Sequence, residues 1–137
     1  MLPFFLLIAS ATAQVSMPAQ DVAAAPAYAP RALAASGDKL KGKLIQLYFL
    51  YRSTIVGKTP DGGLTGEVVD STSTRITAQV QVPKEAVNWF LDIPTTYSGG
   101  AGYSIYARLS EDKFGAPIAV LLGRTVHSDA NGSRIEW

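Results

Sequence analysis

Hydrophobic and polar residues alternate with period two along several short segments of the chain, which is typical of half-buried β-strands. The clearest segment is RITAQVQV at residues 75–82, where Ile76, Ala78, Val80 and Val82 share one face. The segments expected to form strands are 39–56, 64–70, 75–82, 103–109, 118–126 and a short closing strand at 133–137. Turn residues separate these segments, so the pattern predicts a mainly β protein.

The period changes once, directly after residue 82. Pro83 suits the first turn of a helix, where its missing N–H costs nothing. Val87, Phe90 and Leu91 follow with the i, i+3, i+4 spacing of an apolar helix face, and Pro94 ends the element. The sequence therefore predicts one short helix between the third and the fourth strand.

Three strands, a short helix, two strands and a small sixth strand form an order that is similar to the oligonucleotide/oligosaccharide-binding (OB) barrel. In that barrel the helix closes one end, between strands three and four. The resemblance concerns element order and not a residue motif. It implies a small five- to six-stranded β-barrel, although other small barrels and half-open sheets with one packed helix fit the order nearly as well.

The first 37 residues differ in composition from the rest of the chain. LPFFLLIA at 2–9 is a short apolar run, and ATA at 11–13 has the small residues of a cleavage site. Residues 1–13 are therefore interpreted as a signal peptide, with a buried N-terminal strand or helix as the alternative. Residues 14–37 are rich in Ala and Pro and are expected to form an extended tether. The barrel domain is expected over 38–137.

Charge and cysteine content narrow the classes of function. Lys plus Arg number 12 and Asp plus Glu 11, giving a net charge of +1, which argues against a nucleic-acid partner held through many phosphates. Cysteine is absent from the 137 residues, which removes disulfides and thiol chemistry. The sequence contains no histidine pair, phosphate-binding loop or dinucleotide motif, so no metal or cofactor is expected.

Two motifs near the end of the chain resemble a hydrolytic triad and a calcium-binding loop, but a simpler interpretation accounts for both. His127, Ser128 and Asp129 are the residue types of a hydrolytic triad, but neighbours on a strand point to opposite faces. DANGS at 129–133 partly resembles the opening of a calcium loop, and Asn131 begins a glycosylation sequon. The favoured interpretation is a strand that ends at His127 and an Asn-Gly hairpin turn.

The most suggestive cluster combines aromatic and basic residues. The candidate ligand-binding residues are Tyr48, Tyr51, Arg52, Tyr106 and Arg108, preceded along the chain by Lys39, Lys41 and Lys43. Exposed aromatic rings flanked by cations can stack sugar rings or bases. Alternatively, the tyrosines cover the barrel wall and the lysines keep an edge strand soluble.

These observations favour an exported, non-catalytic binding module for a glycan, peptide or small ligand, in the periplasm or outside the cell. The alternative is a structural or assembly subunit that joins a larger complex. A hydrolase with its site near His127 is the third hypothesis.

Overall fold

The computed structural model describes residues 15–70, 77–97 and 99–137, and the expected signal peptide at 1–13 lies outside them. The strands are β1 Val15–Met17, β2 Ala27–Tyr28, β3 Leu44–Phe49, β4 Tyr51–Lys58, β5 Leu64–Val69, β6 Thr77–Val82, β7 Tyr103–Glu111, β8 Pro117–Gly123, β9 Thr125–Asp129 and β10 Gly132–Glu136. The helices are α2 Ala19–Ala23, α3 Pro30–Ser36 and α4 Val87–Leu91, with 3-10 turns η1 Gly37–Leu40 and η2 Lys84–Ala86. The protein is mainly β, as predicted.

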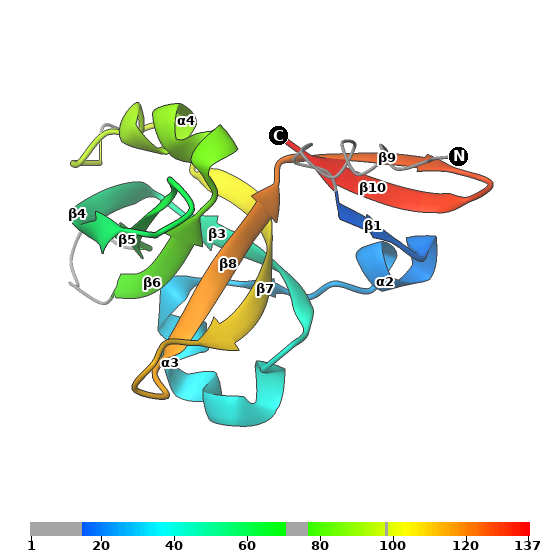
Figure 1. The fold of residues 1–137 in the computed structure, drawn as a ribbon, viewed down its shortest axis with the longest axis horizontal. Coiled ribbons are helices and arrows are strands. Elements are labelled where there is room, and N and C mark those ends of the chain that lie inside the picture. Colours follow the sequence, from blue (N-terminus) through cyan, green and yellow to red (C-terminus); the bar gives the residue numbers. More distant parts are fainter. Residues whose placement is uncertain (1–14, 71–76, 98) are drawn as a thin grey trace.

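The described residues form two sheets (Figure 1). The large sheet is mixed, with the order β2-β3-β7-β8-β6-β5-β4, and the small antiparallel sheet has the order β1-β10-β9. Within the large sheet the pairs β2–β3 and β6–β8 are parallel. Among the described residues β2 and β4 are the two edges of the large sheet, so the closed barrel predicted from the sequence is not confirmed.

The predicted strand at 39–56 is divided in the structure. Leu50 separates β3, which pairs with β7, from β4, which pairs with β5. The amide of Leu50 donates to the carbonyl of Val69 at 2.8 Å, which fixes the bend. Two consecutive halves of one apolar run therefore lie far apart in the strand order, with β4 at one edge and β3 next to the other edge strand, β2.

The alternating faces expected in β6 and β7 are confirmed. Ala78, Val80 and Val82 are buried, and Ile76 lies outside the described residues. The matching positions of β7 are Ile105, Ala107 and Leu109, which are also buried. Both sets belong to one core cluster, together with residues of β3, β5 and β8.

The short helix lies where the sequence predicts it, but it is rotated. It begins as the 3-10 turn η2 and continues as α4, so Ala86, Phe90 and Ile93 become the buried positions. The prediction for Phe90 is confirmed, whereas Leu91 is 43% exposed and its predicted burial is wrong. The buried positions keep the i, i+4, i+7 spacing of a helix face, so the period is right and the stripe is displaced by one residue, from Val87 and Leu91 to Ala86 and Ile93.

Residues 15–40 pack against the rest of the chain, which differs from the extended tether expected at 14–37. Strand β2 adds to the edge of β3, and α3 contacts β6. Val22, Leu33 and Leu40 are buried. The prolines do not prevent these helices, because Pro18 precedes α2 and Pro30 is the first residue of α3, positions where proline is tolerated.

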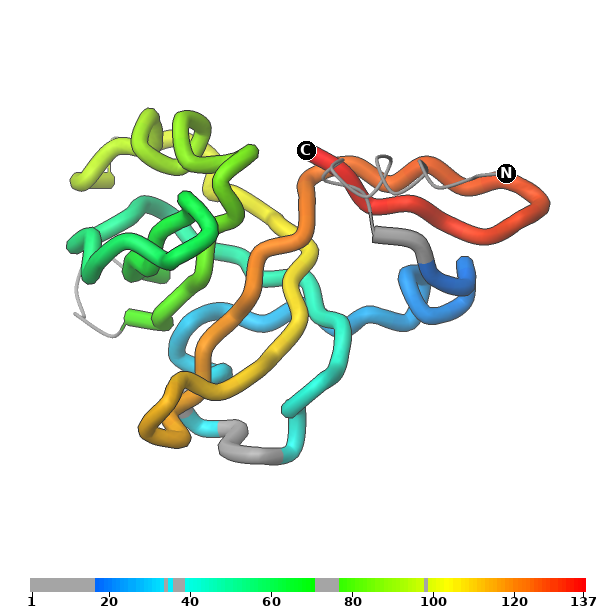
Figure 2. Tube along the Cα trace, viewed as in Figure 1, coloured from blue at the N-terminus to red at the C-terminus, as the bar shows by residue number. Residues whose placement is uncertain are grey.

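The predicted strand at 118–126 is divided at Arg124, where the chain leaves the large sheet for the small one (Figure 2). The predicted Asn-Gly hairpin is confirmed between β9 and β10. The amide of Asn131 donates to the Asp129 carboxylate at 2.8 Å, and Gly132 has a φ of 120°. Strand β1 pairs with the other side of β10. In the described part of the chain, no helix is long and apolar enough to cross a membrane.

Candidate functional site

A groove of about 530 Å³ crosses the outer face of β5 and β6, between the β4–β5 and β7–β8 hairpins. Its floor contains Thr65, Gln79 and Gln81, which alternate with the buried positions of the same strands. Thr65 lies directly opposite Gln81 in the ladder. Hydroxyl and amide groups that donate and accept hydrogen bonds therefore lie side by side on a paired sheet.

Apolar side chains form part of the groove walls. Phe114, in the β7–β8 turn, is 83% exposed, and Val56, on β4, is 54% exposed. Large apolar groups at such exposure mark binding surfaces when they gather in one place. Here they lie on the two sides of a polar floor, which is the composition of a ligand site with an apolar contact and orienting polar groups.

The turn that carries Phe114 is held by Asp112. Its carboxylate oxygen Oδ1 accepts hydrogen bonds from the amides of Phe114 at 2.8 Å and Ala116 at 2.9 Å. Gly115 supplies the positive φ of 83° that the turn requires. The exposed ring is therefore presented by a closed turn and not by a long loop.

A second carboxylate holds the β4–β5 hairpin on the opposite wall. The Asp61 carboxylate accepts hydrogen bonds from the Thr59 hydroxyl and from the Gly63 amide, the latter at 3.2 Å. These bonds, the one from Thr59 above all, lower the pKa of Asp61 because they stabilise its ionised form. A Cβ at Gly63 would lie 2.2 Å from the carbonyl oxygen of Val82, so only glycine fits beside β6.

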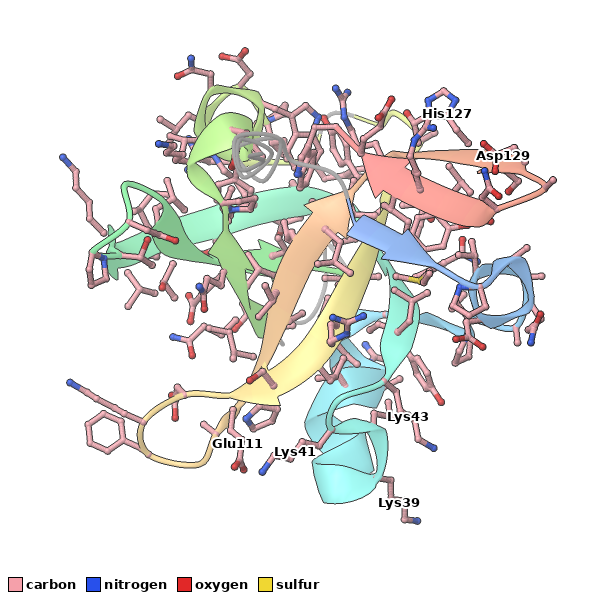
Figure 3. The ribbon with its side chains drawn as sticks, turned by 45° about the vertical axis from the view of Figure 1, so that its right-hand side comes forward. Lys39, Lys41, Lys43, Glu111, His127 and Asp129 are labelled. Atoms are coloured by element: carbon pink, nitrogen blue, oxygen red, sulfur yellow. The ribbon has the colours of Figure 1, made fainter. Side chains whose placement is uncertain are left out.

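The groove is lined by charged residues of both signs, and the carboxylates have partners within the protein. Glu111 pairs with Lys41 at 2.5 Å, and Asp112 caps its own turn. Figure 3 shows Lys41 and Glu111 side by side, with Lys39 and Lys43 away from them. Lys58 and Lys113 also line the groove and form no ion pair among the described residues. The Lys113 ammonium lies 5.2 Å from the centre of the Phe114 ring.

Three of the five binding residues predicted from the sequence share one surface. Tyr48, Tyr106 and Arg108 lie on the outer face of β3 and β7, since Tyr48 pairs with Ser104 and Gln46 with Tyr106. Tyr48 is 42% exposed, Tyr106 is half-buried and Arg108 is exposed. This face is separate from the groove lining.

The other two predicted residues lie beyond the bend at Leu50, on β4. Tyr51 is half-buried. Arg52 is directed at the end of α4, where its Nε donates to the carbonyl of Ile93 at 3.0 Å and its Nη2 to that of Leu91 at 3.3 Å. Its guanidinium also lies 6.0 Å from the centre of the Phe90 ring. Arg52 thus attaches the helix to the sheet.

His127, Ser128 and Asp129 do not converge. The His127 Nε2 lies 2.9 Å from the Glu136 carboxylate. The hydroxyl of the next residue, Ser128, forms a hydrogen bond of 2.7 Å with the Ser133 hydroxyl. His127 and Asp129 lie exposed on the small sheet (Figure 3). The described residues contain no group of three His, Cys, Asp or Glu side chains that is able to hold a metal ion.

The sequence does not predict that the groove residues line a common groove. Alternation predicts that Gln79 and Gln81 face outward, but it does not say which strands lie beside them. Phe114 is a single aromatic residue in the polar turn SEDKFGAP, and that is the one signal pointing to it. Comparison with known protein families, curated protein sequences and solved structures finds no match.

Proposed function

We propose that this protein is a non-catalytic binding module and that its ligand is an oligosaccharide bound in the groove over β5 and β6. The observation that carries the proposal is Phe114, which a closed turn keeps 83% exposed beside the outward amides of Gln79 and Gln81. The C–H face of a sugar ring packs on an aromatic ring, and its hydroxyls need neighbouring donors and acceptors.

The order of strands supports a relation to the OB barrel. If 44–58 is counted as one bent strand, the order runs from its first half through β7, β8, β6 and β5 back to its second half. The short helix α4 follows β6, where an OB barrel has the helix that closes one end. OB barrels bind oligonucleotides and oligosaccharides on the face of their second and third strands, between two hairpin loops. The groove has the corresponding position.

The pairing of the strands favours an oligosaccharide over a peptide that adds a strand. Peptide addition needs a free row of backbone donors and acceptors at a sheet edge. The floor strand β5 is paired with β4 on one side and with β6 on the other. A ligand on this floor therefore meets side chains, which suits the scattered hydroxyls of a sugar. Export to the periplasm or outside the cell, expected from residues 1–13, would bring the groove to such ligands.

The first experiment is a thermal-shift panel of glycans, peptides, single-stranded oligonucleotides and divalent cations on the purified protein. A ligand that binds the folded state raises the free energy of unfolding by about 2.7 kcal/mol at 100 times its Kd. We expect a shift with one or more glycans. We also expect Phe114→Ala to abolish it without lowering the melting temperature of the free protein.

Tyr48→Ala is the matched control, because it removes an exposed ring from the outer face of β3 and β7. Loss of the shift in Tyr48→Ala and its retention in Phe114→Ala would move the site to the face predicted from the sequence. A panel without any shift from a folded protein that self-associates would contradict the proposal. It would favour an assembly subunit.

A further inference from the structure

The charges of the groove narrow the class of glycan, an inference that rests on the proposed function. Four charged residues line it: Lys58, Lys113, Glu111 and Asp112. Both acids already have partners within the protein. Glu111 forms an ion pair with Lys41, and Asp112 accepts two backbone hydrogen bonds in its own turn.

The two lysines come from opposite walls. Lys58 ends β4, and Lys113 lies in the β7–β8 turn beside Phe114. Neither forms an ion pair among the described residues. Asp112 keeps its negative charge beside Lys113, so the four lining residues and Lys41, the partner of Glu111, together carry three positive and two negative charges. A ligand in the groove therefore meets an excess of positive charge. Glu67 lies opposite Gln79, one pair farther along the floor, and is outside the groove lining.

We propose that the groove binds an acidic oligosaccharide, one whose sugar carboxylates pair with Lys58 and Lys113 while one ring stacks on Phe114. Two cations fit a chain with spaced carboxylates. A nucleic acid carries a charge on every phosphate and is bound through a larger basic surface, which a net charge of +1 does not indicate.

The test compares oligogalacturonate with an uncharged oligogalactose of the same length by calorimetric titration of the full protein. We expect oligogalacturonate to bind more tightly and its affinity to fall as salt is added. Lys58→Gln and Lys113→Gln should each weaken oligogalacturonate binding by about two- to fivefold, the range of exposed ion pairs, and leave oligogalactose binding unchanged. Lys113→Arg should retain the affinity.

Lys43→Gln is the matched control, because Lys43 is exposed, lies outside the groove lining and is replaced by the same change of charge. Equal binding of the two oligosaccharides, lost in Phe114→Ala but unaffected by either lysine variant, would overturn the acidic ligand and leave the binding module intact. Tighter binding of a single-stranded oligonucleotide would overturn the glycan in favour of a nucleic acid. No binding of any of these ligands would overturn both proposals.

Discussion

At the scale of single residues, the packing of the helix on the sheet depends on a glycine. A Cβ added to Gly66 on β5 would lie 2.8 Å from the ring of Phe90, which is fully buried. A Cβ added to Gly57, on the adjacent strand β4, would have no atom within 4 Å. The φ of Gly57 also lies outside the left-handed region. Comparing alanine substitutions at the two glycines therefore distinguishes a steric clash with Phe90 from the general effect of replacing a glycine in a strand.

We expect Gly66→Ala to lower the free energy of unfolding by about 1–3 kcal/mol, because Phe90 has to move within a packed core. Gly57→Ala should leave it unchanged or raise it by up to about 1 kcal/mol, since the unfolded chain loses freedom. Urea unfolding of the two variants measures both effects. Equal destabilisation would show that Phe90 does not restrict Gly66.

Asp61 gives a prediction about pH. Its pKa in the folded protein is lowered from 3.8, so the ionised carboxylate stabilises the fold above that value. This stability is lost as the pH falls below 3.8 towards the folded pKa. Asp61→Asn keeps an acceptor oxygen but cannot ionise.

The difference in urea midpoint between the natural protein and Asp61→Asn should therefore be present at neutral pH and shrink below pH 3.8. Asp92→Asn serves as the control, because Asp92 is exposed at the end of α4 and away from this turn. A midpoint difference that does not change between neutral and acidic pH would contradict a role for the Asp61 charge.

At the scale of elements, the sequence and the structure disagree about the burial of the N-terminal segment and of one face of the short helix. Leu33 lies in α3, within the segment expected as a tether, and is 3% exposed. Leu91 lies in α4, on the expected buried stripe, and is 43% exposed. In the structure Leu33 is therefore buried and Leu91 is exposed, which is the reverse of what the sequence predicts.

We expect Leu33→Ala to lower the free energy of unfolding by about 2–5 kcal/mol, the range for a buried leucine replaced by alanine. Leu91→Ala should change it by less than about 1 kcal/mol, because an exposed side chain leaves no cavity. Chemical denaturation of the two variants gives the comparison. A neutral Leu33→Ala would support the tether.

The elements that could be predicted are those with strict alternation, such as β6 and β7, and those with local turn chemistry, such as the hairpin at Asn131 and Gly132. The bend at Leu50 could not be predicted, because it lies inside an apolar run and is fixed by a bond to Val69 on another strand. The bend at Arg124 lies at the polar residues that follow Leu122, but the change of sheet there depends on how β8 and β9 pair with other strands. The same reason applies to the candidate site. Outward-facing Gln79 follows from the period, whereas its place beside Phe114 follows from the order of strands.

At the scale of the whole molecule, an aromatic cluster joins the small sheet to the large one. The rings of Trp89 on α4 and Trp137 after β10 lie 5.1 Å apart, and the Arg124 guanidinium lies 5.5 Å from the Trp89 ring. The amide of Arg124 also donates to the carbonyl of Glu136 at 2.9 Å. Trp137 follows β10, a strand of the small sheet, and its ring packs against the core of the large sheet. It therefore connects the two sheets.

Trp137→Ala should therefore release the small sheet before the large one. Native-state hydrogen exchange of the variant is expected to show faster exchange for amides paired between β9 and β10, such as those of His127 and Arg134. Amides between β5 and β6 should keep their protection, because their ladder and core contacts are unchanged. Tyr97→Ala, which removes an exposed ring from the loop after α4, should alter neither set. Equal acceleration in both sheets would mean that they open as one cooperative unit, in which case the contacts at Arg124 and β1 couple them without the tryptophan pair.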